Sequence, residues 1–321
     1  MMFGEWGGTD EAQCRRMIDL AIEHGINLID TADVYAFGEA EALLGKALAG
    51  RRDDIVVATK FHEPMGEDRN RRGNSRRWIM QAVEGSLRRL GTDWIDLYQV
   101  HRPDPACDID QTLGALSDLV RQGKVRAIGT STFPAEQIVA AQWVAQTRGR
   151  ERFVTEQPPY SLFARAVESA VLPTCQEYGL GVIVWSPLNG GWLTGKYRRG
   201  EALPSDSRAS RYPDHFDYGH PVRERKLDLV EALSTLADQA GVTLTELAIA
   251  FTLEHPAVTA AIVGPRSSDQ LRDQLGGADL VLDPALLDQI DELIQPGINV
   301  HPNDPGWISP ALTADRRRRP R

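Results

Sequence analysis

Cysteine is scarce in this sequence, and no cysteines are paired at metal-ligand spacing. Cys14, Cys107 and Cys175 are the three cysteines of the 321-residue chain, and they lie far apart. A disulfide framework or a structural zinc site needs several closely spaced cysteines, so this usage argues against both and suits a reducing cytoplasm. The seven histidines show no ligand spacing either. We therefore predict no metal site.

Long hydrophobic runs and an excess of positive charge are also absent. No stretch of about 18 apolar residues occurs, and no basic segment followed by an apolar one is found at the amino terminus. Lys and Arg number 36 against 45 Asp and Glu, which gives a net charge of −9. General attraction to nucleic acid or to anionic membranes is therefore unfavourable. We expect a cytoplasmic globular protein with no nucleic-acid or membrane partner.

What the sequence does contain is a regular alternation of strand-like and helix-like segments. The strand-like segments are continuous apolar runs, which is typical of strands buried on both faces of a parallel sheet. They cover residues 26–29, 55–60, 94–101, 125–129, 153–157, 181–185 and 260–263. The predicted helices, several of them followed by a glycine, cover 9–24, 39–49, 75–90, 109–122, 135–146, 167–178, 223–239 and 244–254.

This alternation predicts an α/β fold of the (β/α)8 TIM-barrel type. A doubly wound dinucleotide-binding sheet is less favoured, because no Gly-x-Gly-x-x-Gly follows the early strands. Only four residues, 1–4, remain for an eighth strand before the first helix, too few for a barrel strand. We therefore expect the amino-terminal hairpin and first barrel strand to be missing from this chain. One domain is predicted for residues 1–300, followed by a disordered basic tail at 301–321.

Polar residues follow three consecutive predicted strands. Asp30, Lys60 and His101 each stand at a strand's carboxyl end, and Tyr35 lies in the turn after Asp30. Each has an ordinary structural explanation when taken alone. In barrels of this type, however, active sites are built at the carboxyl ends of several strands. The set of four therefore predicts a catalytic centre.

Three motifs that contain these residues resemble signatures of the aldo-keto reductase superfamily. They are GINLIDTADVY at 25–35, ATK at 58–60 and IDLYQVH at 95–101, and the resemblance covers residues 3 to about 294. The segments WSPL at 185–188, TGKY at 194–197 and SRAS at 207–210 are similar to bacterial members nearest the potassium-channel β subunits.

The resemblance implies NADPH-dependent reduction of an aldehyde or ketone to an alcohol, with a small-molecule carbonyl compound as substrate. Tyr35 would be the proton donor. A free phenol is a poor acid at neutral pH, and the Lys60 ammonium would stabilise the phenolate. Asp30 would hold Lys60 charged and oriented, and His101 would polarise the substrate oxygen.

The resemblance also implies a cofactor site. Trp185 would stack on the nicotinamide, with Ser131 and Gln157 on its carboxamide. The family usually has asparagine where this chain has Thr132. The remaining implied NADPH ligands are Ser186, Pro187, Leu188, Lys196, Arg208, Gly264, Arg266, Gln270, Asp273 and Gln274.

The adenosine end of that site has a physical rationale of its own. The segment IVGPRSSDQ at 262–270 runs from a strand into a helix amino terminus, which favours anion binding. Arg266 and Gln270 would meet the 2′-phosphate, so NADPH is favoured over NADH. Asp273 and Gln274 would face adenine, although the family commonly has Glu-Asn there.

A long irregular stretch at 189–222 predicts a functional loop or lid. Its aromatic side chains could line the substrate mouth or belong to a solvated loop: Tyr197, Tyr212, His215, Phe216 and Tyr218. Two further functions remain open: an NADP(H)-binding redox-sensing module like the channel β subunits, and an NAD(P)-dependent sugar or alcohol dehydrogenase. Homo-oligomerisation is open as well.

Overall fold

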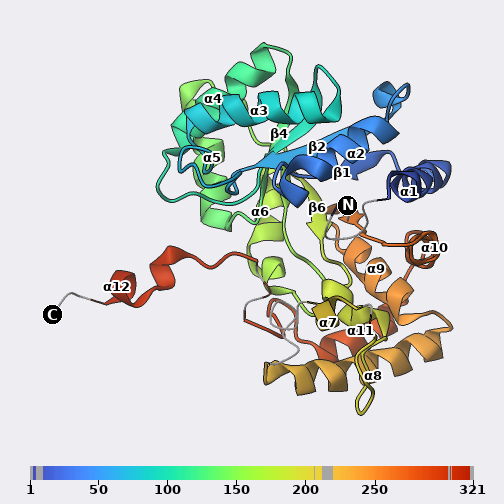
Figure 1. The fold of residues 1–321 in the computed structure, drawn as a ribbon. Coiled ribbons are helices and arrows are strands. Elements are labelled where there is room, and N and C mark those ends of the chain that lie inside the picture. Colours follow the sequence, from blue (N-terminus) through green and yellow to red (C-terminus); the bar gives the residue numbers. More distant parts are fainter. Residues whose placement is uncertain are drawn as a thin grey trace.

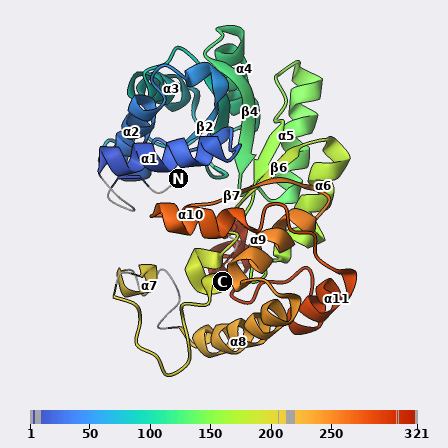
Figure 2. The same cartoon turned by 90° about the vertical axis from the view of Figure 1, so that its right-hand side faces the viewer.

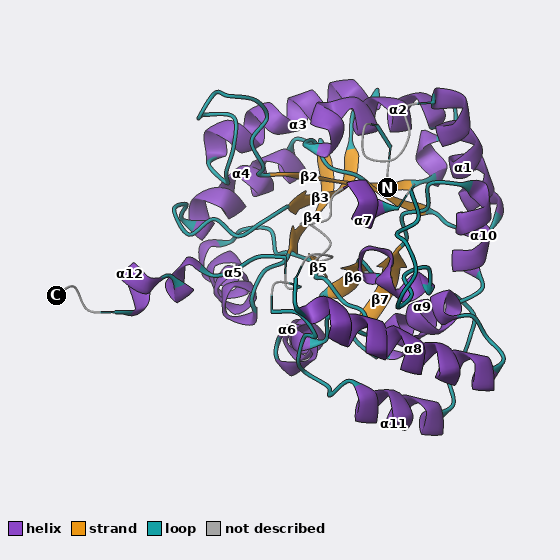
Figure 3. Ribbon diagram, turned by 60° about the horizontal axis from the view of Figure 1, so that its bottom comes forward, coloured by secondary structure: helices purple, strands orange, loops and turns teal. Residues whose placement is uncertain are grey.

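The computed structural model describes residues 3–4, 10–205, 207–211, 220–302, 304 and 306–318. Within these residues, seven parallel strands form one sheet in sequence order, β1 to β7. The strands surround a common centre and the helices lie outside them (Figure 3), so the sheet is a nearly closed barrel. The predicted (β/α)8 TIM-barrel architecture is confirmed, with seven barrel strands among the residues described.

The strands and helices alternate along the chain, as Figure 1 shows. The strands are β1 (Leu28–Asp30), β2 (Val56–Phe61), β3 (Ile95–Val100), β4 (Val125–Ser131), β5 (Thr155–Gln157), β6 (Gly181–Trp185) and β7 (Val258–Ile262). The helices that follow or precede them are α1 (Glu11–Glu23), α2 (Glu39–Ala47), α3 (Arg76–Leu90), α4 (Ile109–Arg121), α5 (Ala135–Arg148), α6 (Val171–Tyr178), α8 (Val222–Ala240), α9 (Leu244–Glu254), α10 (Ser268–Leu275) and α11 (Pro284–Leu293).

Side-chain caps begin many of these helices. The Asp10 carboxylate accepts from the backbone N–H groups of the first turn of α1, and Ser75 caps α3 in the same way. Thr243 and Glu246 form a reciprocal capping box at α9. Such caps satisfy backbone donors that have no partner inside the helix. Each of these three capped helices begins within two residues of its predicted start.

Two layers of apolar side chains stabilise the barrel. One small cluster takes a residue from each of six strands and fills the barrel centre: Leu28, Ala58, Leu97, Ala127, Ile183 and Ile262. The alternate strand residues, such as Val57, Ile128 and Val182, belong to the large core between strands and helices. This burial on both faces explains the continuous apolar runs in the sequence.

β1 and β7 are the two edges of the sheet. β1 pairs only with β2, and β7 pairs only with β6, among the residues described. The predicted gap in the barrel therefore falls between β1, which carries Asp30, and β7, which leads to Arg266. In Figure 2, α1 and α10 lie side by side across this part of the molecule.

The helix predicted for 167–178 is wrong in its first half. Residues Ala166–Ser169 form a short 3-10 helix, η3, and α6 begins only at Val171. A helix from 167 would place Pro173 in its interior, where its ring clashes with the carbonyl of Ser169. Starting at Val171 puts Pro173 in the first turn, where a missing N–H has no cost.

The stretch at 189–222 is not wholly irregular either. It contains a 3-10 helix, η4 (Asn189–Thr194), and the short helix α7 (Arg208–Arg211). Tyr197 is buried in the core. The other aromatic residues predicted for the substrate mouth, Tyr212, His215, Phe216 and Tyr218, lie outside the described residues.

The last segment leaves the barrel and extends away from it (Figure 1). It carries two single helical turns, η5 (Pro310–Leu312) and α12 (Ala314–Arg317). The domain boundary at residue 300 and the disorder of the tail remain predictions. None of the helices in the described residues is long and apolar enough to cross a membrane.

Candidate active site

A buried ion pair joins the carboxyl ends of β1 and β2. The Lys60 Nζ donates to Asp30 Oδ2 at 2.5 Å and to the Thr31 carbonyl at 2.8 Å. Lys60 is 0% exposed and Asp30 6%. An uncompensated charge at such depth would be very unfavourable, so the two groups stabilise each other's charged forms.

Two amides hold the other oxygen of Asp30. Gln157 Nε2 donates to Asp30 Oδ1 at 2.8 Å, and Gln99 Nε2 lies 3.4 Å from the same atom. Gln99 precedes Val100 at the end of β3 and Gln157 ends β5. The sequence predicted Gln157 as a cofactor ligand and missed Gln99 altogether. Because parallel strands bring their carboxyl ends to one edge, all three side chains meet there.

Tyr35 and His101 lie next to this ion pair. Their ring centroids are 5.8 Å apart in an edge-to-face arrangement, and Lys60 Nζ is 5.3 Å from the centre of the Tyr35 ring. Burial alone would lower the pKa of Lys60, but Asp30 and the Tyr35 phenol outweigh it and raise that pKa above its ordinary value. Lys60 is therefore an ammonium ion at neutral pH.

His101 is neutral in this surrounding. Burial, and then the positive charges of Lys60 and Arg102, hold the pKa of His101 well below its ordinary value. Its Nδ1 is buried without a hydrogen-bond partner among the described residues. A neutral imidazole carries one N–H donor, so His101 can donate to an oxygen without bringing a second net charge. The four predicted catalytic residues are thus brought together.

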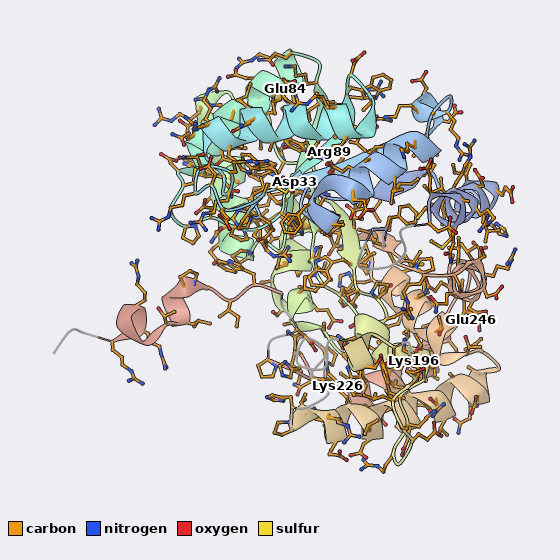
Figure 4. All side chains as sticks on the ribbon, in the orientation of Figure 1. Asp33, Glu84, Arg89, Lys196, Lys226 and Glu246 are labelled. Atoms are coloured by element: carbon orange, nitrogen blue, oxygen red, sulfur yellow. The ribbon has the colours of Figure 1, made fainter. Side chains whose placement is uncertain are left out.

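A buried acidic cluster behind Tyr35 was missed by sequence reasoning. Asp33 is 1% exposed and Glu41 0%. Thr59 Oγ1 donates to Glu41 at 2.6 Å and Arg89 pairs with it at 2.7 Å. Burial, and then the charge of Glu41, raise the pKa of Asp33 to about 8. In Figure 4, Asp33, in the loop after β1, lies close to Arg89 of α3.

Arg102, the residue after His101, is a further site residue that the sequence analysis did not single out. Its Nη1 donates to the His101 carbonyl at 2.6 Å and lies 3.3 Å from Thr132 Oγ1. Its guanidinium carbon is 6.0 Å from the centre of the Trp185 ring. Arg102 therefore connects the catalytic residues with the predicted nicotinamide side. The motif HRPD at 101–104 was the available signal.

The residues predicted to bind the carboxamide end β4 and β5. Ser131 and Gln157 are partners in the sheet register, and Ser131 Oγ donates to the Gln157 carbonyl at 2.9 Å. Thr132 follows with a positive φ of 60°, a conformation that a β-branched residue seldom adopts. Strain of this kind is concentrated at functional sites.

Trp185 ends β6 beside these residues and is half-buried. A Cβ on Gly306 would stand 2.7 Å from the Trp185 ring, so the segment near the carboxyl end of the chain contacts this ring closely. Ser186, Pro187 and Leu188 continue the chain, and Ser186 also has a positive φ of 63°.

The loop after β6 is folded tightly around Lys196. Asn189, Gly190 and Gly191 have φ values of 44°, 67° and 100°. A Cβ on Gly191 would stand 3.0 Å from Lys196 Nζ. Left-handed residues within a turn can direct backbone N–H groups toward an anion, and a lysine beside such a turn suits a phosphate group.

Lys226 of α8 supports that loop and was also missed from the sequence. It is 1% exposed and donates to Asn189 Oδ1 at 3.1 Å. Its Nζ lies 5.6 Å from the centre of the Trp192 ring and 3.6 Å from Asp304 Oδ1. Figure 4 shows Lys226 and Lys196 in the same part of the molecule. Arg208 begins α7, but its side chain is outside the described part of the structure.

The predicted adenosine site lies between β7 and α10. Ser267 caps α10, and Gln270 Oε1 accepts from the Arg266 N–H at 2.8 Å. Gln13 of α1 donates to the Arg266 carbonyl at 3.2 Å. Gly264 and Asp273 are exposed, whereas Gln274 is buried with its Oε1 lacking a partner among the described residues. Gln270 therefore orders the loop that carries Arg266.

Comparison with known proteins agrees with this arrangement. The sequence model of the Aldo/keto reductase family matches residues 1–295. Over 305 residues the chain is 36% identical to a probable voltage-gated potassium channel subunit beta of Arabidopsis thaliana, with 92% of both chains covered. It is 37% identical over 296 residues to the uncharacterized oxidoreductase YrpG of Bacillus subtilis, covering 89% of this chain and 88% of that one.

A third relative has a more specific name. Over 269 residues the chain is 37% identical to the aldo-keto reductase YhdN of Bacillus subtilis, covering 83% of this chain and 78% of that one. The family match spans nearly the whole barrel, and the four signature residues meet at one point of it. The protein is therefore an oxidoreductase that belongs to the aldo/keto reductase family.

Proposed function

We propose that this protein reduces aldehyde and ketone carbonyls to alcohols with NADPH, using Tyr35 as the general acid. The convergence of Tyr35, His101 and Lys60 at the strand ends carries the proposal. When bound, NADPH supplies a hydride to the carbonyl carbon and leaves as NADP+. The remaining requirement is a proton for the carbonyl oxygen, and the chain's own residues can provide it.

Proton transfer follows from the charges of the site. Tyr35 gives its proton to the carbonyl oxygen, and the Lys60 ammonium stabilises the phenolate that remains. Asp30 keeps Lys60 charged and fixed through the 2.5 Å hydrogen bond. His101, being neutral, donates a hydrogen bond to the same oxygen as negative charge develops on it.

We further propose that the cofactor lies across the ends of β4 to β7. Trp185 would face the nicotinamide, and Ser131, Thr132 and Gln157 would lie by its carboxamide. The loop of Ser186, Pro187 and Leu188 with Lys196 and Arg208 would hold the pyrophosphate. Gly264, Arg266 and Gln270 would bind the 2′-phosphate, and Asp273 and Gln274 would contact adenine. The tight turn around Gly191 and Lys196 supports this placement.

The test is the Tyr35→Phe variant. We expect NADPH affinity within about twofold of the parent, since the hydroxyl is not proposed to touch the cofactor. Aldehyde reduction should fall at least about a thousandfold, within the range known for losing a general acid. Tyr178→Phe, at the end of α6 away from the site, is the matched control. Full turnover by Tyr35→Phe would remove Tyr35 from the proposed role.

A second candidate function is an NADP(H)-binding regulatory subunit. Two relatives with similar coverage are named as probable channel β subunits, and this similarity is the observation that favours the alternative. Oxidation of NADPH by the purified protein with a panel of aldehydes discriminates the two. Tight NADPH binding without turnover of any aldehyde would favour the regulatory function.

An NAD(P)-dependent sugar or alcohol dehydrogenase is the third reading. It would be recognised by faster oxidation of alcohols with NAD+ than reduction of carbonyls with NADPH. The positive charge of Arg266 near the α10 amino terminus favours NADPH instead. We also propose a cytoplasmic location; whether the protein forms a homo-oligomer is a question for size-exclusion chromatography with light scattering.

A further inference from the structure

Arg102 lies beside the proposed catalytic centre, and no carboxylate of the described residues pairs with its charge. Its described contacts are made by Nη1, which donates to the His101 carbonyl and approaches Thr132 Oγ1. The guanidinium carbon lies over the Trp185 ring, 6.0 Å from its centre. The hydrogen bonds engage only one of the three guanidinium nitrogens.

The other two nitrogens form the edge of the guanidinium that fits a carboxylate. Neither Nε nor Nη2 has a hydrogen bond among the described residues, and neither is buried away from solvent. A guanidinium binds a carboxylate through two parallel N–H donors. Arg102 is held by Nη1 at the His101 carbonyl, and its charge lies close enough to Tyr35 for the two groups to interact electrostatically.

The charges around Arg102 leave its positive charge uncompensated. Lys60 is paired with Asp30, and His101 is neutral because of its lowered pKa. Among the described residues, no carboxylate oxygen lies within 4.0 Å of the Arg102 guanidinium.

Glu156 and Glu63 act on Arg102 electrostatically, but neither carboxyl group pairs with it. Glu156 lies within the core, bonded to Thr130 at 2.5 Å and to the Phe133 N–H at 3.1 Å, and burial raises its pKa to about 7. Glu63 acts on Arg102 only through its field. The centre as a whole therefore carries about one net positive charge.

We propose that Arg102 binds a carboxylate group of the substrate, so that the preferred substrates are aldehydes or ketones with a carboxylate elsewhere in the molecule. The inference rests on the proposed carbonyl reduction, because it adds the substrate class to that reaction. Arg102 is then a specificity-determining residue: it anchors the non-reacting end while Tyr35 and His101 act on the carbonyl oxygen.

The experiment compares two substrates of nearly equal size and reactivity. The enzyme with NADPH is assayed with 4-carboxybenzaldehyde and with methyl 4-formylbenzoate, its neutral ester. Arg102→Gln should lower the kcat/KM ratio of acid to ester by about ten- to a hundredfold, mainly through KM, since a hydrogen-bonded charge pair is lost. Arg102→Lys, with one point charge instead of a fork, should retain part of the preference.

A matched control is available at the opposite end of the barrel. Arg126, before the middle of β4, also lies over a tryptophan, with its guanidinium carbon 4.7 Å from the Trp94 ring centre. Arg126→Gln makes the same change of charge and removes a similar stacking contact. It should leave the acid-to-ester ratio unchanged.

The outcomes separate this inference from the proposed function. Equal losses for acid and ester in Arg102→Gln would mean that Arg102 only supports His101 and Trp185, and would overturn the inference. Reduction of neither aldehyde by the parent protein would count against the proposed function instead. In that case calorimetric titration with benzoate decides: binding at least tenfold weaker in Arg102→Gln supports the inference, and unchanged binding overturns it.

Discussion

The two halves of the proposed site differ in how completely the protein itself holds their side chains. In the catalytic half, Asp30, Lys60 and His101 are at most 6% exposed, and Asp30 and Lys60 are bonded to each other and to neighbouring groups. In the cofactor half, Ser131 and Gln157 at the carboxamide end are buried, whereas Arg266 and Asp273 at the adenosine end are half-buried and exposed respectively. The cofactor half also depends on loops with left-handed residues, such as Asn189.

This difference shows which part of the chemistry is preorganised. Proton transfer needs fixed distances before the substrate arrives, and a buried network supplies them. Cofactor binding can use side chains that become ordered only against the ligand, at some entropic cost. Substitutions should therefore impair turnover and folding together in the first half, and affinity alone in the second.

The largest effect is expected for Lys60→Met. It removes the cation that stabilises the Tyr35 phenolate and leaves Asp30 buried without its counter-ion. Turnover should fall at least about a thousandfold, and the free energy of unfolding by about 3–5 kcal/mol. Urea denaturation and steady-state kinetics measure the two effects.

Lys46→Met is the control for that change. Lys46 pairs with Glu11 on the surface, where the two side chains are 61% and 57% exposed. An exposed pair of this kind contributes about 0–1 kcal/mol, so both stability and turnover should be nearly unchanged. A Lys60→Met protein as stable as the Lys46→Met protein would contradict the difference between the halves.

An intermediate effect is expected for Arg266→Ala in the cofactor half. Loss of one cation at the 2′-phosphate should weaken NADPH binding by about ten- to a hundredfold, with NADH affinity and unfolding free energy nearly unchanged. Fluorescence titration with both cofactors measures this. Arg272→Ala, on the exposed side of α10 and 3.4 Å from Asp269, should alter neither affinity. Equal weakening of NADH and NADPH by Arg266→Ala would reject the 2′-phosphate assignment.

The smallest effect on turnover is expected at Asp33, where the change appears instead as a pH dependence of stability. The pKa of Asp33 is raised from its model-compound value of 3.8 to about 8 in the folded protein. The neutral form therefore favours folding below the unfolded pKa, and that contribution is lost as the pH rises from about 4 through about 8. The slope is at most about 1.4 kcal/mol per pH unit.

Asp33→Asn keeps the shape of the neutral carboxyl group and cannot ionise. As the pH rises from 5 to 8, its unfolding free energy should increase relative to that of the parent protein. Its turnover should be nearly unchanged at pH 7. Urea titrations at several pH values provide the comparison. Parallel pH profiles for the two proteins would show that Asp33 does not titrate in this range.

The barrel was largely predictable because its signals are local. Glycines after helices, apolar runs and caps such as Ser75 and Thr243 act within a few residues of where they stand. The half-helix at 167–170 was predicted wrongly, although Pro173 was visible in the sequence. α11 was not predicted at all, although Leu286, Leu287, Ile290 and Leu293 follow a helical spacing and Asp283 and Pro284 mark its start.

The four catalytic residues could be found because each follows a strand and matches a family motif. Gln99, Arg102 and Glu41 were missed because important partners lie far along the chain. Gln99 and Asp30 are 69 positions apart, Glu41 and Arg89 are 48 apart, and Arg102 and Thr132 are 30 apart. A buried glutamate or glutamine looks like any polar residue until its surroundings are known.

The sequence alone determined the alternation of strands and helices, the acidic charge and the order in which Asp30, Tyr35, Lys60 and His101 follow the strands. Only the tertiary structure decided that Lys60 and Asp30 form a buried pair, that His101 is neutral and that Arg102 keeps an unused pair of donors beside them. The reason is that burial and electrostatic fields are sums over residues from many strands. No local stretch of sequence contains that sum.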